Sequence, residues 1–106
     1  MIRELAILDV IPGKEKAFEA AFREAQPIIA SMPGYLGHGL ERCLEQPSRY
    51  VLLVEWRRLE DHTEGFRGSE PYQRWNALLH HFYDPFPTVL HFEAVAGTSS
   101  TPDGAR

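Results

Sequence analysis

The sequence has a single cysteine, Cys43, so no disulfide can form within the chain. A lone thiol suits a reducing compartment. No apolar run approaches the roughly 20 residues that a membrane-spanning helix needs, and the N-terminus lacks the basic and then apolar pattern of a signal peptide. We therefore expect a cytoplasmic protein with no membrane partner.

Positive charge is also scarce, with 11 Lys and Arg against 15 Asp and Glu residues and a net charge of −4. This balance offers no footprint for a phosphate backbone, so we expect no nucleic acid partner. Glycine-rich nucleotide loops and the G-x-S-x-G motif are missing, which argues against nucleotide-dependent and ordinary hydrolytic chemistry. His80 and His81 point about 100° apart on a helix and cannot easily share one ion, so no metal site is expected.

A chain of 106 residues, 43% of them hydrophobic, indicates one globular domain. We place that domain at residues 1–96. Small and polar residues fill 97–106, which predicts a disordered C-terminal tail.

The periodicity of apolar residues predicts four strands, two helices and a short helical turn. The expected strands are 2–11, 35–44, 50–57 and 88–96, the helices are 14–32 and 69–82, and the turn is 59–66. Pro27 predicts a kink or an early end of the first helix, and Gly37 and Gly39 predict a bulge. The order β-α-β-β-α-β is that of the ferredoxin-like α+β fold, an antiparallel four-stranded sheet with helices on one face.

Both faces of the strands are apolar. On the strand at 50–57, Leu52 and Val54 point to one side while Val51 and Leu53 point to the other. A sheet with one wet face should alternate between apolar and polar residues. We therefore predict that a second copy covers the outer face to form a homodimer; the alternative is a monomer with an exposed patch. Glu55, among these apolar residues, needs a partner such as Arg42 or Arg57.

Several short motifs occur in a defined order along residues 2–95. They are Val10-Ile11-Pro12-Gly13-Lys14-Glu15, Pro33-Gly34-Tyr35, the strand from Tyr50 to Trp56, His62, and Pro87-Thr88-Val89-Leu90-His91-Phe92. In this order the chain resembles the antibiotic biosynthesis monooxygenase family. The resemblance implies a dimeric α+β barrel. It also implies an oxidoreductase, since the family includes cofactor-independent oxygenases of polycyclic aromatics and quinols, as well as haem-degrading enzymes.

Two family patterns are incomplete in this chain. Polyketide-oxidising members carry Asn in an N-x-x-x-W pattern, where this chain has Leu52 before Trp56. Haem-degrading members carry an Asn on the first strand, which this chain lacks, so haem is disfavoured and no cofactor is expected. The favoured hypothesis is a cofactor-independent monooxygenase acting on a small aromatic or quinol-like ligand. The alternative is a dimeric domain that is non-catalytic or binds haem or another small ligand.

His62 is the candidate catalytic residue, because a neutral imidazole can exchange protons near pH 7 and because its position matches a His common in the family. Trp56 and Phe66 are candidate substrate-binding residues, with core packing as the alternative for each. Tyr72 and Trp75 share a helix face, where they pack on the sheet or line a substrate pocket.

His38 and His91 lie on different predicted strands, and the favoured prediction for both is a structural, hydrogen-bonded role; the alternative is that the two rings face each other. The sequence leaves the roles of His80 and His81 open.

Overall fold

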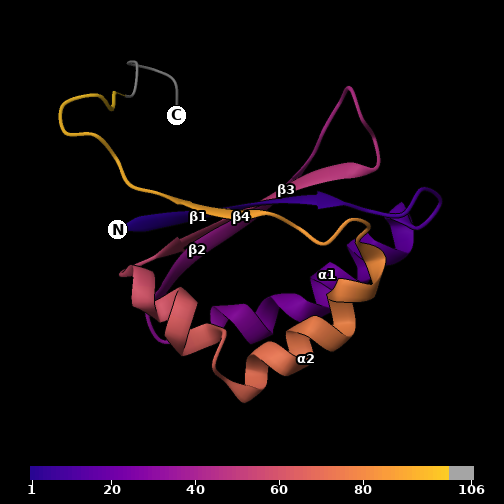
Figure 1. Ribbon diagram of the computed structural model, residues 1–106, viewed down its shortest axis with the longest axis horizontal. Coiled ribbons are helices and arrows are strands. Elements are labelled where there is room, and N and C mark those ends of the chain that lie inside the picture. The colour runs from indigo at the N-terminus through magenta and orange to yellow at the C-terminus, as the bar shows by residue number, and fades with distance from the viewer. Residues whose placement is uncertain (101–106) are drawn as a thin grey trace.

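The computed structural model describes residues 1–100; residues 101–106, most of the predicted tail, lie outside the described residues. The elements along the chain are β1 (Ile2–Asp9), α1 (Glu15–Ala30), β2 (Tyr35–Arg42), β3 (Arg49–Trp56), η1 (Asp61–Phe66), α2 (Glu70–Leu79), η2 (His80–Phe82) and β4 (Val89–Phe92). The strands form one antiparallel sheet in the order β2-β3-β1-β4. Figure 1 shows α1 and α2 on one face of this sheet, while no helix or strand of residues 1–100 covers the other. The predicted ferredoxin-like α+β fold is confirmed.

The last strand is shorter than the predicted 88–96. Its register runs from Ala6 opposite Val89 to Arg3 opposite Phe92. Continued, this register would place residue 93 opposite Ile2, the first residue of β1, and residue 94 opposite Met1. The last two predicted positions, 95 and 96, therefore have no partner along β1.

Helix α1 passes through Pro27 and ends at Ala30, so an early end at Gln26 is wrong. Proline removes one donor from the helix ladder. The helix continues because its buried stripe extends on both sides of Pro27, with Phe22 and Ala25 before it and Ile29 after it. Tertiary packing of an amphipathic face supplies most of the stability of such a helix.

The turn into β2 requires glycine. Gly34 has φ +84°, and a Cβ built on it would lie 2.2 Å from Oδ2 of Asp61 in η1. The turn therefore holds η1 closely against the sheet. Just beyond it the register shifts between Tyr35 and Gly37, which confirms the predicted bulge.

The core lies between the helices and the inner face of the sheet. Phe18 of α1 is fully buried and its ring contacts four other aromatic rings, those of Phe22, Tyr50, Phe82 and Tyr83. Such edge-to-face contacts stabilise a core beyond the area that they bury.

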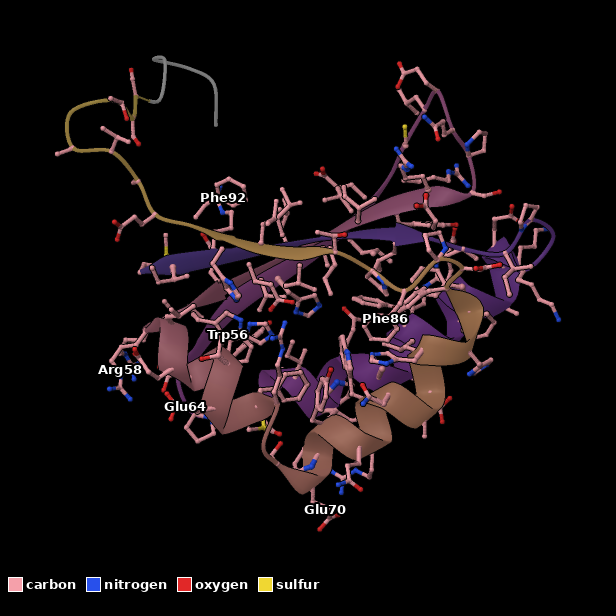
Figure 2. All side chains as sticks on the ribbon, in the orientation of Figure 1. Trp56, Arg58, Glu64, Glu70, Phe86 and Phe92 are labelled. Carbon is pink, nitrogen blue, oxygen red and sulfur yellow. The ribbon has the colours of Figure 1, made fainter. Side chains whose placement is uncertain are left out.

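The outer face of the sheet is apolar in the middle and charged at its ends. Leu5 is opposite Leu53 across β1 and β3, and Phe92, 50% exposed, projects from this face (Figure 2). At one end Arg3 pairs with Glu55 at 2.9 Å. The expected partners of Glu55, Arg42 and Arg57, were wrong, because Arg3 is its direct cross-strand neighbour.

We predict that Phe18→Ala lowers the free energy of unfolding by about 3–5 kcal/mol, because it leaves a cavity among four rings. The measurement is urea unfolding at one fixed protein concentration. Lys16→Ala, a change on the exposed side of α1 two residues before Phe18, should stay within about 0.5 kcal/mol of the parent. A loss below about 1 kcal/mol in Phe18→Ala would contradict this packing.

Candidate active site

A buried carboxyl group lies on the inner face of the sheet. Glu4 of β1 is 6% exposed and points toward the helices, as do Ala6 and Leu8 further along the strand. In the register, Glu4 is opposite Val54 on β3 and His91 on β4. Directly opposed side chains on one face of a sheet lie about 5 Å apart at Cβ, so the register itself brings Glu4 and His91 together.

Trp56 supplies a hydrogen bond to this carboxyl group. It lies two residues along β3 from Val54 and therefore diagonal to Glu4 on the same face. Its Nε1–H donates to Oε1 of Glu4 at 3.0 Å. The ring is fully buried on the helix side of the sheet (Figure 2).

The short segment η1 brings His62 over the carboxyl group. It is a π-helix, in which the Arg67 N–H donates to the carbonyl of His62 at 3.1 Å. This wide turn places His62 and Phe66 on one side, with ring centroids 6.5 Å apart. The imidazole of His62 stacks on the Trp56 ring, with the two ring centroids 5.4 Å apart and the ring planes inclined by 17°. Such π-turns occur frequently at functional sites.

Each ring nitrogen of His62 faces a titratable partner. Nε2 lies 3.3 Å from Oε1 of Glu4, and Nδ1 shares a hydrogen bond of 2.8 Å with Nε2 of His91. His62 is 3% exposed. We call Glu4, His62 and His91 the acid–histidine cluster.

The surroundings push both buried members of this cluster toward their neutral forms. Burial raises the pKa of Glu4, opposed by the Trp56 hydrogen bond and by the positive charge of Arg67. Burial, together with Arg67 and His91, lowers the pKa of His62 to about 3. Near pH 7 the His62 ring is therefore uncharged, and its contact with Glu4 is not an ion pair.

Glu4 and His62 of this cluster line a cavity of about 360 Å³, which we call the aromatic cavity. Burial lowers the pKa of His80 and raises that of Tyr83 at this cavity. Lining side chains come from the sheet, both helices, η1 and the segment before β4. They are Glu4, Ala6, Leu8, Ile29, Leu52, His62, Phe66, Arg67, Tyr72, Trp75, His80, Tyr83, Phe86, Pro87 and Val89.

The structure brings four of the residues that the sequence singled out to this cavity: His62, Phe66, Tyr72 and Trp75. Trp56 instead packs behind His62 and holds Glu4. Sequence reasoning missed Glu4. The available signal was an acidic residue at an inward position of a strand whose next inward residues, Ala6 and Leu8, are apolar.

The alternative in which His38 faces His91 is wrong, whereas the favoured structural role of His38 agrees with its hydrogen bonds. Their strands, β2 and β4, lie at opposite edges of the sheet. His38 instead bonds through Nδ1 to the Tyr35 hydroxyl at 2.6 Å and through Nε2 to Oε1 of Gln26 at 2.8 Å.

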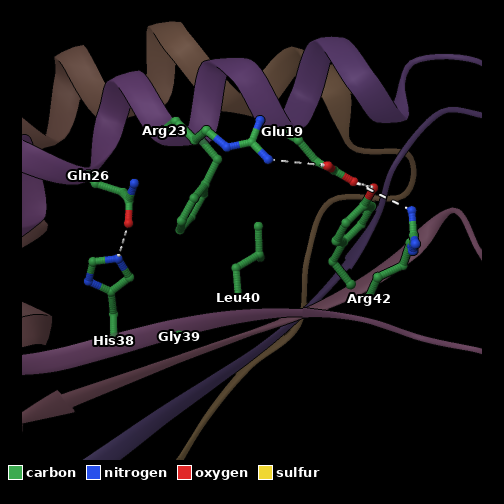
Figure 3. A pocket seen from close by; sticks show the side chains of 9 residues that line it. Glu19, Arg23, Gln26, His38, Gly39, Leu40 and Arg42 are labelled. Atoms are coloured by element: carbon green, nitrogen blue, oxygen red, sulfur yellow. Dashed lines mark hydrogen bonds and ion pairs between the residues drawn. The ribbon is translucent and has the colours of Figure 1, made fainter.

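A second hollow of about 430 Å³ lies between α1 and β2 (Figure 3). Its polar groups satisfy one another: Glu19 accepts a hydrogen bond from the Tyr50 hydroxyl and lies 3.7 Å from Arg23 and 3.8 Å from Arg42. Burial and Glu19 raise the pKa of Tyr50 to about 12, so this phenol stays protonated. The charges of this second hollow are already paired with one another. We therefore regard the aromatic cavity, and not this hollow, as the candidate active site.

Within residues 1–100, no group of three or more His, Cys, Asp or Glu side chains is placed to hold a metal ion. Over the same residues, no helix has the length and apolar character needed to cross a bilayer.

The family model of the antibiotic biosynthesis monooxygenases matches residues 1–78, about three-quarters of the chain. The chain belongs to this family. A Bacillus subtilis protein, YczJ, is 60% identical over 95 residues, which cover 90% of this chain and 100% of YczJ. The resemblance seen in the sequence motifs is thereby confirmed.

Solved structures of the family share the fold. A Bordetella bronchiseptica protein described as an antibiotic biosynthesis monooxygenase superposes with TM-score 0.86 at 36% identity, covering 89% of this chain and 96% of that one. SnoaB of Streptomyces nogalater, a cofactor-independent oxygenase, superposes with TM-score 0.76 at 17% identity, covering 96% of this chain and 97% of that one. At that identity the likeness to SnoaB concerns the fold alone.

We predict that Glu4→Gln becomes progressively more stable than the parent as pH rises above 4.5, the ordinary value for the group. Because the folded pKa is raised, the native parent binds more protons than the unfolded chain between 4.5 and that pKa, so its stability falls with rising pH. The amide of the Glu4→Gln variant does not titrate, so the stability of that variant does not fall with pH at this site. Urea unfolding at several pH values measures the difference; the exposed Glu64→Gln change is the matched control. A difference independent of pH would contradict a raised Glu4 pKa.

Proposed function

We propose that this protein is a cofactor-independent monooxygenase that acts on a small hydroxylated aromatic or quinol-like substrate in the aromatic cavity. One observation carries the proposal: a buried carboxyl group, Glu4, with a raised pKa forms the polar end of a cavity walled by aromatic rings. Family membership supports the reaction class.

The cavity suits one small planar substrate. Its volume of about 360 Å³ lies at the lower end of the range of ordinary ligand pockets. Phe66 forms edge-to-face contacts with Tyr72 and Trp75, with centroids 5.0 and 5.7 Å away, so this wall is rigid. A flat aromatic ring packs favourably against such a wall.

The cluster supplies the proton transfer. Glu4 in its ionised form receives the hydroxyl proton of the substrate, since a carboxylate with a raised pKa is a stronger base, better matched to a phenol, than an ordinary one. His62, uncharged and held between Glu4 and His91, shares and positions that proton. Arg67, whose charge acts on both Glu4 and His62, stabilises the substrate anion.

The electron-rich anion then reacts with dioxygen directly. In the overall reaction a ring C–H and the phenolic C–OH of the substrate both become C=O. One oxygen atom of dioxygen enters the ring, and the other leaves as water with the two displaced hydrogens. The substrate supplies all four electrons that reduce dioxygen, so the reaction that we propose requires no resident cofactor. Haem ligation by His62 would first have to break its contacts with Glu4 and His91, which argues against the haem-binding alternative.

We further propose that the working form is a homodimer in which the outer sheet faces of two copies meet. The centre of this face is apolar, with Leu5 opposite both Leu53 and Leu90. The ion pairs Arg3–Glu55 and Arg49–Asp9 at its two ends give the polar rim typical of an interface. Burying half-exposed aliphatic side chains there contributes about 1–3 kcal/mol each.

Oxygen consumption with a panel of small quinols and hydroxyarenes tests the activity. We expect the parent to consume oxygen, and Glu4→Gln and His62→Ala to lower the rate by about 100-fold or more, because each removes a member of the proton-transfer pair. His81→Ala, at an exposed position of η2, is the control and should retain the parent rate. Parent-like rates in both cluster variants would refute the proton-transfer role, and no consumption with any substrate would favour the non-catalytic alternative.

Sedimentation tests the dimer. Leu53→Lys introduces a charge at the centre of the outer face and should raise the dissociation constant by about 100-fold or more, since burying an unpaired charge costs several kcal/mol. Ala17→Lys places the same charge on the exposed side of α1 and should leave the dimer intact. A parent that sediments as a monomer at micromolar concentration would overturn the assembly.

A further inference from the structure

The acid–histidine cluster has an unusual connectivity, because one buried imidazole bridges two titratable groups through opposite nitrogens. His62 faces Glu4 with Nε2 and His91 with Nδ1. Glu4 and His91 are also direct neighbours in the β1–β4 register, so the sheet fixes both ends of the bridge. The His62 side is fixed by its stack on Trp56 and by the π-turn.

The cluster leads from the cavity toward the surface. Glu4 lines the aromatic cavity and is 6% exposed, and His62 is 3% exposed. His91 is only half-buried and lies on β4, an edge strand of the sheet. A proton that leaves Glu4 through these two rings therefore reaches solvent without passing through the cavity.

We propose that His62 and His91 form a two-way proton relay that connects the Glu4 carboxyl group to solvent at the β4 edge, and that both rings exchange tautomers whenever Glu4 changes its charge. Such a relay lets the buried acid ionise while a substrate fills the cavity. It deepens the proposed function, because it explains how Glu4 is prepared as a base.

The proton balance of the relay is complete. With Glu4 protonated, its O–H donates to Nε2 of His62, Nδ1–H of His62 donates to Nε2 of His91, and the neutral His91 ring carries its one N–H proton on Nδ1. On ionisation the Glu4 proton moves to Nε2 of His62, the His62 Nδ1 proton moves to Nε2 of His91, and the His91 Nδ1 proton leaves to water. The carboxyl group has lost one proton, and both rings are neutral before and after. Return of a proton from water reverses each step.

The charges around the cluster favour this transfer over one through an imidazolium ion. Burial and Arg67 lower the pKa of both His62 and His91, so a lasting positive charge on either ring is disfavoured. Four polar groups surround His62. They are Glu4 from β1, Trp56 from β3, His91 from β4 and Arg67 at the end of η1. Oε1 of Glu4 and Nε2 of His62 lie 3.3 Å apart, which is long for a hydrogen bond, so proton transfer between them requires the two groups to move slightly closer.

Nitrogen-15 NMR of the imidazole rings tests the relay without any turnover. Between about pH 4 and about pH 9 we expect His62 to change from the Nδ1–H to the Nε2–H tautomer, at the same midpoint as the carbon-13 signal of the Glu4 carboxyl group. In Glu4→Gln this switch should be absent. A single His62 tautomer over the whole range in the parent protein would overturn the proposal.

A second measurement tests the exit through His91. After a rapid pH change, His91→Phe, which keeps a ring but no nitrogen, should slow the change of Glu4 protonation by about tenfold or more. His81→Phe is the matched control, in which Glu4 should change its protonation at the parent rate. An unchanged rate in a folded His91→Phe variant would remove His91 from the relay. A tautomer switch without oxygen consumption would leave the relay intact and refute the proposed function, whereas oxygen consumption with a fixed tautomer would do the opposite.

Discussion

A carboxyl group held on the apolar face of a sheet is the constraint on which this site depends. An ionised carboxylate away from water is costly, so it must be neutral or find donors. Glu4 has both compensations, a raised pKa and the Trp56 N–H at 3.0 Å. A donor stabilises a buried acid only if the geometry of the hydrogen bond is fixed. The full burial of Trp56 and the stacking of His62 from η1 on its ring fix this geometry.

The same constraint orders the aromatic residues. His62 stacks on Trp56, Phe66 packs beside His62, and Trp75 meets Phe66 edge-on. This continuous series of rings joins the polar cluster to the core built around Phe18, through Phe22. The cavity wall is therefore part of the hydrophobic core, which keeps the reacting groups and the substrate surface in one rigid frame.

The fold followed from the sequence because its signals are local and periodic. The apolar run at residues 50–57 and the helical spacing after Lys14 required no knowledge of distant contacts. The start of the second helix is also local, since the Ser69 hydroxyl accepts a hydrogen bond from the Tyr72 N–H. The site followed less completely. His62 was found as a titratable group beside a strand, whereas its pairing with Glu4 and His91 depends on strand register and on a π-turn, and neither is encoded within a short window of sequence. The alternative pairing of His38 with His91 failed for the same reason, because spatial strand order differs from chain order.

Strand β4 is joined to the sheet along one side only, through a register of four residue pairs with β1. Short edge strands fray more readily than central ones, and local opening of this kind costs less free energy than global unfolding. His91 and Val89 both belong to this strand, so one fraying event separates His91 from His62 and uncovers the wall of the cavity at Val89. Amide hydrogen exchange at residues 89–92 therefore reports on the opening of the cavity. If ligand binding slows this exchange, the ligand enters by separation of β4 from β1 and not by movement of a loop.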